Sequence, residues 1–185
     1  MLQNIAIFLI SSVMSFYISA VVLRFLLAGA RADFYNPFAQ VIVKLTNPPL
    51  VKLRRLIPAV GKLDTAAIVL ALLLEIVLQF IIMLIGGSTT SLGNNNIFTV
   101  LGLAILSLTR TVIWIYIIAI ILSVVISWVG NRNSNPIYNL ADSLVEPILE
   151  PIRRYVPNIA GVDFSYFIAL LGLQVVLMVI AAITF

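Results

Sequence analysis

The 185-residue chain contains no cysteine and no histidine, and charged residues make up only 10% of it. These absences exclude disulfides, thiolate nucleophiles, imidazole general bases and every Cys- or His-ligated metal site. No nucleophile–base pair can be assembled from the residues that remain. The sequence therefore predicts neither an enzyme nor a bound cofactor.

Apolar residues are abundant, at 62% of the chain. A soluble domain is about half apolar and about a quarter charged, and it has too little interior to bury a larger share. The composition indicates an all-α membrane protein. The net charge of +4 does not indicate a nucleic-acid partner, because the basic residues flank the hydrophobic runs, where they set topology.

Four stretches reach the length of about 20 apolar residues that a transmembrane helix needs. They cover residues 5–27, 64–85, 97–128 and 164–185. The first is expected to be an uncleaved anchor, because no basic residue precedes it. The third is too long for one perpendicular helix. We expect Arg110, at the outer interface, to divide it into a lead-in (97–108) and a spanning part (111–128), although 97–109 could also belong to the same helix.

The charges predict the orientation. The connections between the spans of each pair carry all the basic residues but two, whereas the middle loop (86–96) has no charged residue. By the positive-inside rule, both basic connections are cytoplasmic, and the middle loop and both termini lie outside. The basic residues of the connections are Arg31, Lys44, Lys52, Arg54, Arg55, Lys62, Arg132, Arg153 and Arg154.

The chain repeats itself at an offset of 99 positions without a gap. The matches include Asn36-Pro37 with Asn135-Pro136, Arg54-Arg55 with Arg153-Arg154, and Asp64 with Asp163. We therefore predict two repeats, at 1–96 and 97–185. Each contains two crossings, so the repeats are parallel and related by an axis along the membrane normal.

The two connections, at residues 34–62 and 131–161, have the pattern of helices that lie in the membrane interface. Each opens with Asn-Pro, a helix start, and continues with periodic apolar residues. A second proline, at Pro48-Pro49 or Pro147, is expected to start another short helix. The arginine pairs at its end are candidate sites for anionic lipid headgroups or for a protein partner, and the simpler alternative is a topology signal.

Two acidic features accompany these connections. Asp64 and Asp163 begin the second helix of each repeat, where a carboxylate caps the backbone N–H groups. Glu146 and Glu150 in the second connection replace an asparagine and a valine in the first. The two interfacial faces are therefore expected to differ in charge, as they would if one of them has its own partner.

Three polar residues fall inside the predicted spans and form a candidate intramembrane polar site. Glu75 lies about 16 Å from Asp64 along a helix, near the midplane, and its counterpart in the second repeat is Gln174. Their similar depth predicts a shared contact between the repeats. Arg24 is the expected ion-pair partner of Glu75, and an ion or proton path through Glu75 and Gln174 is the alternative.

The chain resembles the YggT family of small bacterial membrane proteins over nearly its whole length. The resemblance rests on both Asn-Pro pairs, on residues 147–154 (PILEPIRR), and on Pro157 with residues 161–165 (GVDFS). It implies a multi-pass protein of the bacterial inner membrane. Relatives are linked to osmotic stress and potassium uptake, to cell division, and in plastids to nucleoid distribution and cytochrome assembly.

Two functions remain open at this point. The favoured one is a scaffold or assembly and stress-response factor that recruits partners through its cytoplasmic amphipathic segments. A protein partner or a homo-oligomer is expected, because small residues such as Ser11, Ser15 and Ser19 recur at the spacing that permits close helix packing. The alternative is a channel or transport component for small cations, with Glu75 near its path.

Overall fold

A computed structural model describes residues 1–57, 64–86, 97–129, 135–156 and 163–184. These residues form six helices and no strand. The helices are α1 (Leu2–Gly29), α2 (Pro37–Arg54), α3 (Thr65–Gly86), α4 (Ile97–Val129), α5 (Pro136–Arg153) and α6 (Ser165–Thr184). The helices α1, α3, α4 and α6 are long and apolar enough to cross a membrane. The predicted all-α class with four candidate spans is confirmed.

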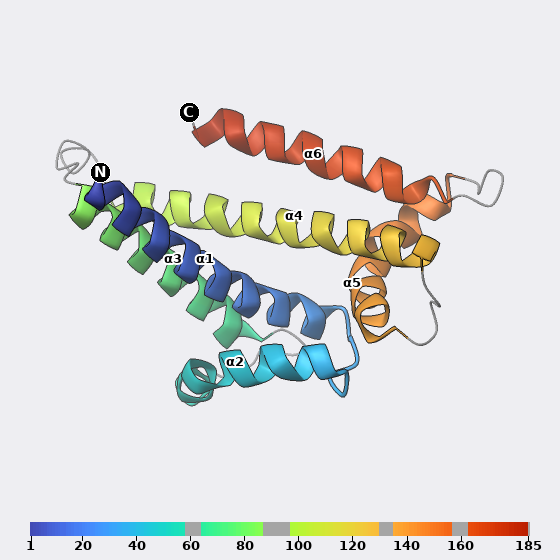
Figure 1. Cartoon of the computed structure of the whole chain (residues 1–185), viewed down its shortest axis with the longest axis horizontal. Coiled ribbons are helices and arrows are strands. Elements are labelled where there is room, and N and C mark those ends of the chain that lie inside the picture. Colours follow the sequence, from blue (N-terminus) through green and yellow to red (C-terminus); the bar gives the residue numbers. More distant parts are fainter. Residues whose placement is uncertain (58–63, 87–96, 130–134, 157–162, 185) are drawn as a thin grey trace.

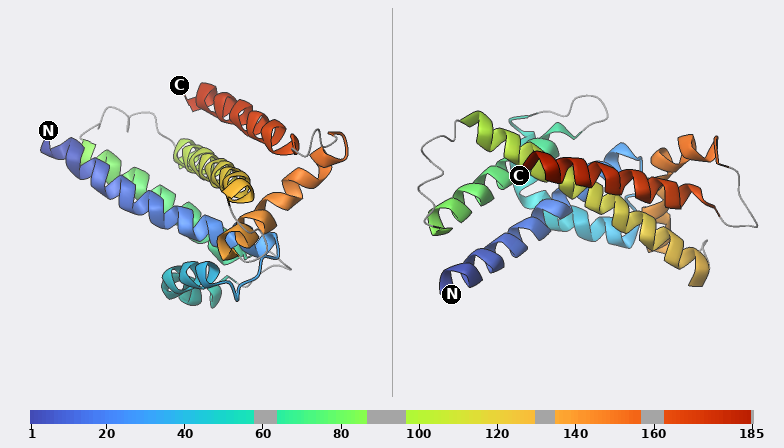
Figure 2. Two further views of the ribbon diagram at one scale, coloured as in Figure 1. Left: turned by 45° about the vertical axis from the view of Figure 1, so that its right-hand side comes forward. Right: turned by 90° about the horizontal axis from the view of Figure 1, so that it is seen from above.

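The four long helices run side by side, and α4 lies between the α1–α3 pair and α6 (Figure 1). The shorter helices α2 and α5 both lie at the ends of the spans that are remote from the two termini (Figures 1 and 2). This arrangement agrees with two parallel repeats, in which each connecting helix meets the membrane on the same side.

The third apolar stretch forms one continuous helix of 33 residues. The prediction that Arg110 divides it is wrong. Arginine is a good helix former, and no proline stands near this position to remove a backbone donor. Arg110 lies in this same helix, one turn from Ser107, which hydrogen-bonds to Glu75 in the middle of α3. Its position at the outer interface stays a prediction.

Each interfacial connection also contains one helix in the described residues, where two short helices were predicted. In α2 the prolines bend the helix rather than end it, and its last turns point away from its first ones (Figure 1). Pro49 cannot donate to the carbonyl of Leu45, four residues earlier. The hydroxyl of Tyr17 in α1 donates to that carbonyl instead, at 3.4 Å. The spanning helix thus satisfies a group that the proline leaves free.

The two Asn-Pro motifs start α2 and α5 and also join the repeats. The side-chain oxygen of Asn36 accepts from the backbone N–H of Phe38, and that of Asn135 accepts from Ile137. The side-chain amide of Asn36 also donates to the carbonyl of Pro136 at 2.6 Å. The starts of the two interfacial helices are therefore hydrogen-bonded to each other.

The repeats have equivalent cores. In each repeat, a leucine of the interfacial helix is completely buried against the spans, Leu50 in α2 and Leu149 in α5. Small residues on α3, among them Ala66, Ala67 and Ala71, allow α1 to pack closely against it. Leu50 and Leu149 thus fix each interfacial helix to the bundle, whereas the periodic apolar residues Phe38, Val41 and Leu45 of α2 are exposed.

The outward sides of the four spans are covered with large apolar side chains, such as Phe16 on α1, Phe80 on α3 and Phe167 on α6. Continuous apolar surfaces of this size are rare on soluble monomers. A lipid environment accounts for them, because no water is then in contact with these side chains.

Replacing Asn36 tests whether the cross-repeat hydrogen bond stabilises the fold. Asn36→Ala should lower the free energy of unfolding by about 1–2 kcal/mol, because it removes a helix cap and the bond to Pro136. The measurement is equilibrium unfolding in detergent, followed by circular dichroism. Asn135→Ala is the matched control, since it loses only a cap. Equal losses in both variants would contradict a role for the cross-repeat bond.

Candidate functional site

An arginine at the end of each interfacial helix binds the aspartate that precedes the next span. Arg54 pairs with Asp64 in the first repeat, through both Nε and Nη2. In the second repeat, Nε of Arg153 lies 2.8 Å from the Asp163 carboxylate. The two contacts are equivalent at the offset of 99. Each closes a ten-residue segment and fixes the end of an interfacial helix to the start of a span.

In the second repeat this contact is part of a larger cluster. Nη1 of Arg153 donates to both carboxylate oxygens of Glu146, at 2.7 and 2.9 Å. The guanidinium also lies over the ring of Tyr166, 5.6 Å from its centre, and Nη2 donates to the hydroxyl at 3.3 Å. Arg153 is thus held by two carboxylates and an aromatic ring, and 33% of its side chain remains exposed.

The electrostatics of this cluster favour the charged forms. Burial alone would raise the pKa of Asp163. Hydrogen bonds from the backbone N–H of Ser165 and from Arg153 outweigh burial, so the pKa lies below its ordinary value of 3.8. Burial alone would lower the pKa of Arg153. The contacts with Asp163 and Glu146 raise this pKa by more than burial lowers it, so it lies above its ordinary value. Each ion therefore stabilises its partner's charge.

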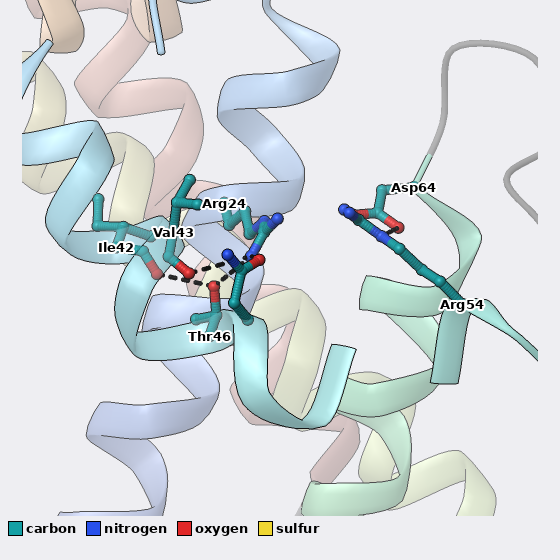
Figure 3. Close-up of polar contacts among 7 residues, drawn as sticks. Arg24, Ile42, Val43, Thr46, Arg54 and Asp64 are labelled. Atoms are coloured by element: carbon teal, nitrogen blue, oxygen red, sulfur yellow. Dashed lines mark hydrogen bonds and ion pairs between the residues drawn. The ribbon is translucent and has the colours of Figure 1, made fainter. Parts of the chain in front are cut away.

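In the first repeat, the additional charged residue near the Arg–Asp contact is Arg24, which belongs to a spanning helix. Arg24 of α1 donates through Nη1 to Thr46 Oγ1 and Asn47 Oδ1 of α2, both at 2.8 Å, and to the Val43 carbonyl at 3.4 Å (Figure 3). Thr46 is completely buried, and its hydroxyl donates in turn to the carbonyl of Ile42. The acceptors around Arg24 are all neutral.

The equivalent sites therefore carry opposite charge. Two arginines, Arg24 and Arg54, stand against Asp64 in the first repeat. In the second repeat, Arg153 stands between two carboxylates. The reason is a pair of substitutions at the offset of 99, where Ser123 takes the place of Arg24 and Glu146 that of Asn47.

The second arginine of each pair faces outward. Arg154 pairs with Glu150 one turn earlier, and both side chains are more than half exposed. Arg55 is exposed, and no bond joins its side chain to the described residues. The four predicted lipid- or partner-binding arginines thus divide into a first pair, Arg54 and Arg153, that binds aspartate and is still 41% and 33% exposed, and a second pair that binds no aspartate.

The structure does not bring the three intramembrane polar residues together. The predicted ion pair between Arg24 and Glu75 is wrong, because Arg24 turns toward α2 and Glu75 accepts a 2.9 Å hydrogen bond from Ser107 of α4. The predicted contact between Glu75 and Gln174 is also wrong. Gln174 is exposed on α6, on the far side of α4 from α3 (Figure 1).

Nothing in the sequence pointed to Thr46 or Tyr166, and Asn47 and Glu146 stood out only as a difference in charge between the two connections. The contrast between Asn47 and Glu146 was visible in the repeat alignment, but the contribution of Arg24 to the same site was not. Within the described residues, no group of three or more His, Cys, Asp or Glu side chains could hold a metal ion.

These features define a class of protein: a multi-pass helical membrane protein made of two tandem repeats, each with an interfacial helix between two spans. A family model described as CCB3/YggT matches residues 3–85 and again residues 102–184. The two matched ranges differ by 99 positions at each end (102 − 3 and 184 − 85), the offset of the repeat. The chain belongs to the CCB3/YggT family.

Proteins similar to this chain occur in several bacteria. The chain is 41% identical to an uncharacterized protein in the proC 3′ region of Vibrio alginolyticus, over 90% of this chain and 88% of the relative. It is 37% identical to the uncharacterized protein PA0392 of Pseudomonas aeruginosa, covering 97% and 89%. It is 36% identical to the uncharacterized protein YggT of Escherichia coli K12, covering 98% and 92%. No solved structure matches the chain.

Replacing Asp163 tests the Arg–Asp contact through its pH dependence. The pKa of Asp163 is lower in the folded state than in the unfolded state, so the contact stabilises the fold fully above about pH 4. This stability is lost as the pH falls through the folded-state pKa. Asp163→Asn should lose about 1 kcal/mol at pH 7 and show a weaker dependence of unfolding free energy on pH.

The matched control is Glu150→Gln, which removes the exposed ion pair between Glu150 and Arg154, one helical turn apart. Such pairs contribute only a few tenths of a kcal/mol, so this variant should unfold like the parent. Both are measured by equilibrium unfolding between pH 2 and pH 7. If Asp163→Asn keeps the pH profile of the parent, the contact does not hold the interfacial helix.

Proposed function

We propose that the chain is a scaffold of the bacterial inner membrane that docks a cytoplasmic protein on α5. The observation that carries this proposal is the difference in charge between two interfacial helices of equal architecture. The exposed side chains of α2 include Lys44 and Lys52 and no acidic residue, whereas α5 exposes Glu150. The proposed orientation, with α2 and α5 cytoplasmic, is supported by the basic residues of both connections.

The rigidity of α5 supports the same proposal. Its end is held by the contacts of Arg153 with Asp163 and Glu146, and Leu144, Val145 and Leu149 are buried against α4 and α6. A helix that is fixed at its apolar face and at its end is already ordered, so a partner that binds its outer residues has no entropic cost of ordering the helix. We infer a partner with a basic segment, because Glu150 and the partly exposed Glu146 lie on the outer side of α5, where such a segment would take the place of Arg154 at the exposed Glu150.

A site-specific photo-crosslinker compares the two helices directly. It is placed at Ile148 of α5 and, in a second variant, at Pro49 of α2, since these positions are equivalent at the offset of 99 and both are partly exposed. In cells, a protein adduct should form from α5 and not from α2. Glu150→Lys should reduce the yield of the α5 adduct by about fivefold, because it replaces attraction by repulsion at an exposed position.

Lys52→Glu, read out with the α2 probe, is the control for a general effect of surface charge. The same adduct from both helices, or an adduct from α5 that is insensitive to Glu150→Lys, would contradict docking on α5. Arg153 is unsuitable for this test, because its replacement would break the contacts with Asp163 and Glu146.

A second candidate function, conduction of small cations, is supported by Glu75. Its side chain is 4% exposed, in the middle of α3, and its one hydrogen bond within the described residues comes from Ser107. Ionisable groups at this depth commonly belong to ion or proton paths. The position of Gln174 on the opposite side of α4 removes the second group that a path through both repeats would use.

Potassium flux into proteoliposomes decides between the two functions. If the scaffold proposal is correct, the folded parent protein should show no flux above empty vesicles, and Glu75→Gln should behave in the same way. Flux from the parent that falls at least about tenfold in Glu75→Gln would establish conduction with Glu75 on the path. Correct insertion is verified in the same vesicles by protease protection.

A further inference from the structure

The guanidinium group of Arg24 has unused hydrogen-bonding capacity. Its side chain is 6% exposed, and the three hydrogen bonds that it makes to the described residues all leave from Nη1. Arginine has five N–H donors in a planar fork, and Nε and Nη2 make no hydrogen bond to the described residues. The acceptors on α2 are two carbonyl-type oxygens and a hydroxyl, and none of them carries a negative charge.

A second guanidinium group lies near enough to act on Arg24 electrostatically. Arg54 extends from the end of α2 to Asp64, and its terminal nitrogens lie on the side of Asp64 that faces Arg24 (Figure 3). Arg24 interacts electrostatically with both Arg54 and Asp64. One aspartate thus stands against two arginines, which leaves one positive charge uncompensated at this site.

We propose that Arg24 and Arg54 form a binding site for the phosphate group of an anionic phospholipid. A phosphate group accepts paired N–H donors from guanidinium groups and supplies the charge that the site lacks. Arg24 lies five residues before the end of α1, about 8 Å along the helix. A headgroup layer about 5–8 Å thick borders the hydrocarbon on each side, so a residue this close to the end of a span is within reach of it. The proposed occupant is therefore a lipid phosphate rather than a free anion.

The second repeat is an internal control for this assignment. It has the same helices and the same Arg–Asp contact, but Ser123 occupies the position of Arg24, and Glu146 neutralises Arg153. A negatively charged ligand would be repelled there. The site is thus specific to the first repeat, and one lipid per chain is expected.

The proposal does not depend on docking at α5, since lipid binding to the first repeat would remain if no protein partner bound the second. It also differs from the general attraction of basic interfacial residues to anionic lipids. That attraction acts through any exposed charge, such as Arg55, whereas the proposed site requires Arg24, which is almost completely buried.

The experiment uses the full chain, purified in a neutral detergent and titrated with phosphatidylglycerol or phosphatidylcholine. Native mass spectrometry counts the bound lipids. The parent should retain one phosphatidylglycerol at least about tenfold more tightly than phosphatidylcholine. Inorganic phosphate at millimolar concentration should not displace it. Displacement by inorganic phosphate would overturn the assignment to a lipid.

Two variants locate the site. Arg24→Gln should weaken the retention of phosphatidylglycerol at least about tenfold, because it removes the charge and the fork of donors. Asn47→Asp covers the case in which Arg24→Gln fails to fold. It places a carboxylate where Asn47 Oδ1 already accepts from Arg24 at 2.8 Å, as Glu146 does for Arg153 in the second repeat. It should keep the fold and weaken retention to a similar extent.

Arg55→Gln is the matched control, since it removes the same charge from an exposed position at the end of α2. Its retention of phosphatidylglycerol should stay within about twofold of the parent. Folding of each variant is measured by circular dichroism. If folded Asn47→Asp binds phosphatidylglycerol like the parent, or if Arg55→Gln weakens binding as much as Arg24→Gln does, the proposal is wrong.

Discussion

A charged side chain near the hydrocarbon of a bilayer is costly unless another group of the protein meets it. In this chain the ends of both interfacial helices obey that constraint in the same way, since Arg54 binds Asp64 and Arg153 binds Asp163. Each contact fixes a helix that lies along the membrane to a helix that crosses it. At the same ends of the bundle, Leu50 and Leu149 are completely buried against the spans.

The two repeats share one backbone arrangement but differ in the sign of the charge around the Arg–Asp contact. The backbone arrangement, the caps at Asn36 and Asn135 and the Arg–Asp contacts are common to both. Two substitutions, at the positions of Arg24 and Asn47, change the sign of the charge around the contact. A duplicated fold tolerates this divergence because the apolar burial that holds each interfacial helix does not involve the substituted side chains. We therefore infer that the first repeat meets lipid headgroups and that the second meets a protein.

Sequence equivalence does not ensure spatial proximity. Glu75 and Gln174 occupy the same position in the two repeats, yet α4 lies between their helices, so Glu75 is buried against Ser107 and Gln174 faces outward. In a parallel repeat, equivalent helices of the two units pack against different neighbours. The helix α3 packs against both α1 and α4, whereas the span against which α6 packs in the described residues is α4 (Figure 1). The environment of a polar residue in the membrane therefore follows from the neighbouring helix and not from its own position in the repeat.

The sequence by itself determined the number of spans, the duplication at 99 positions and the amphipathic helices between the spans, because hydrophobic length, proline and asparagine act locally along the chain. It did not determine where the charged side chains turn. Arg24 could reach Glu75 by depth alone, but it reaches Thr46 and Asn47, because the bend of α2 brings their oxygens next to α1. Arg110 did not interrupt α4, because a charge by itself removes no backbone hydrogen bond. Such pairings depend on how helices pack against one another, and only the tertiary structure decided them.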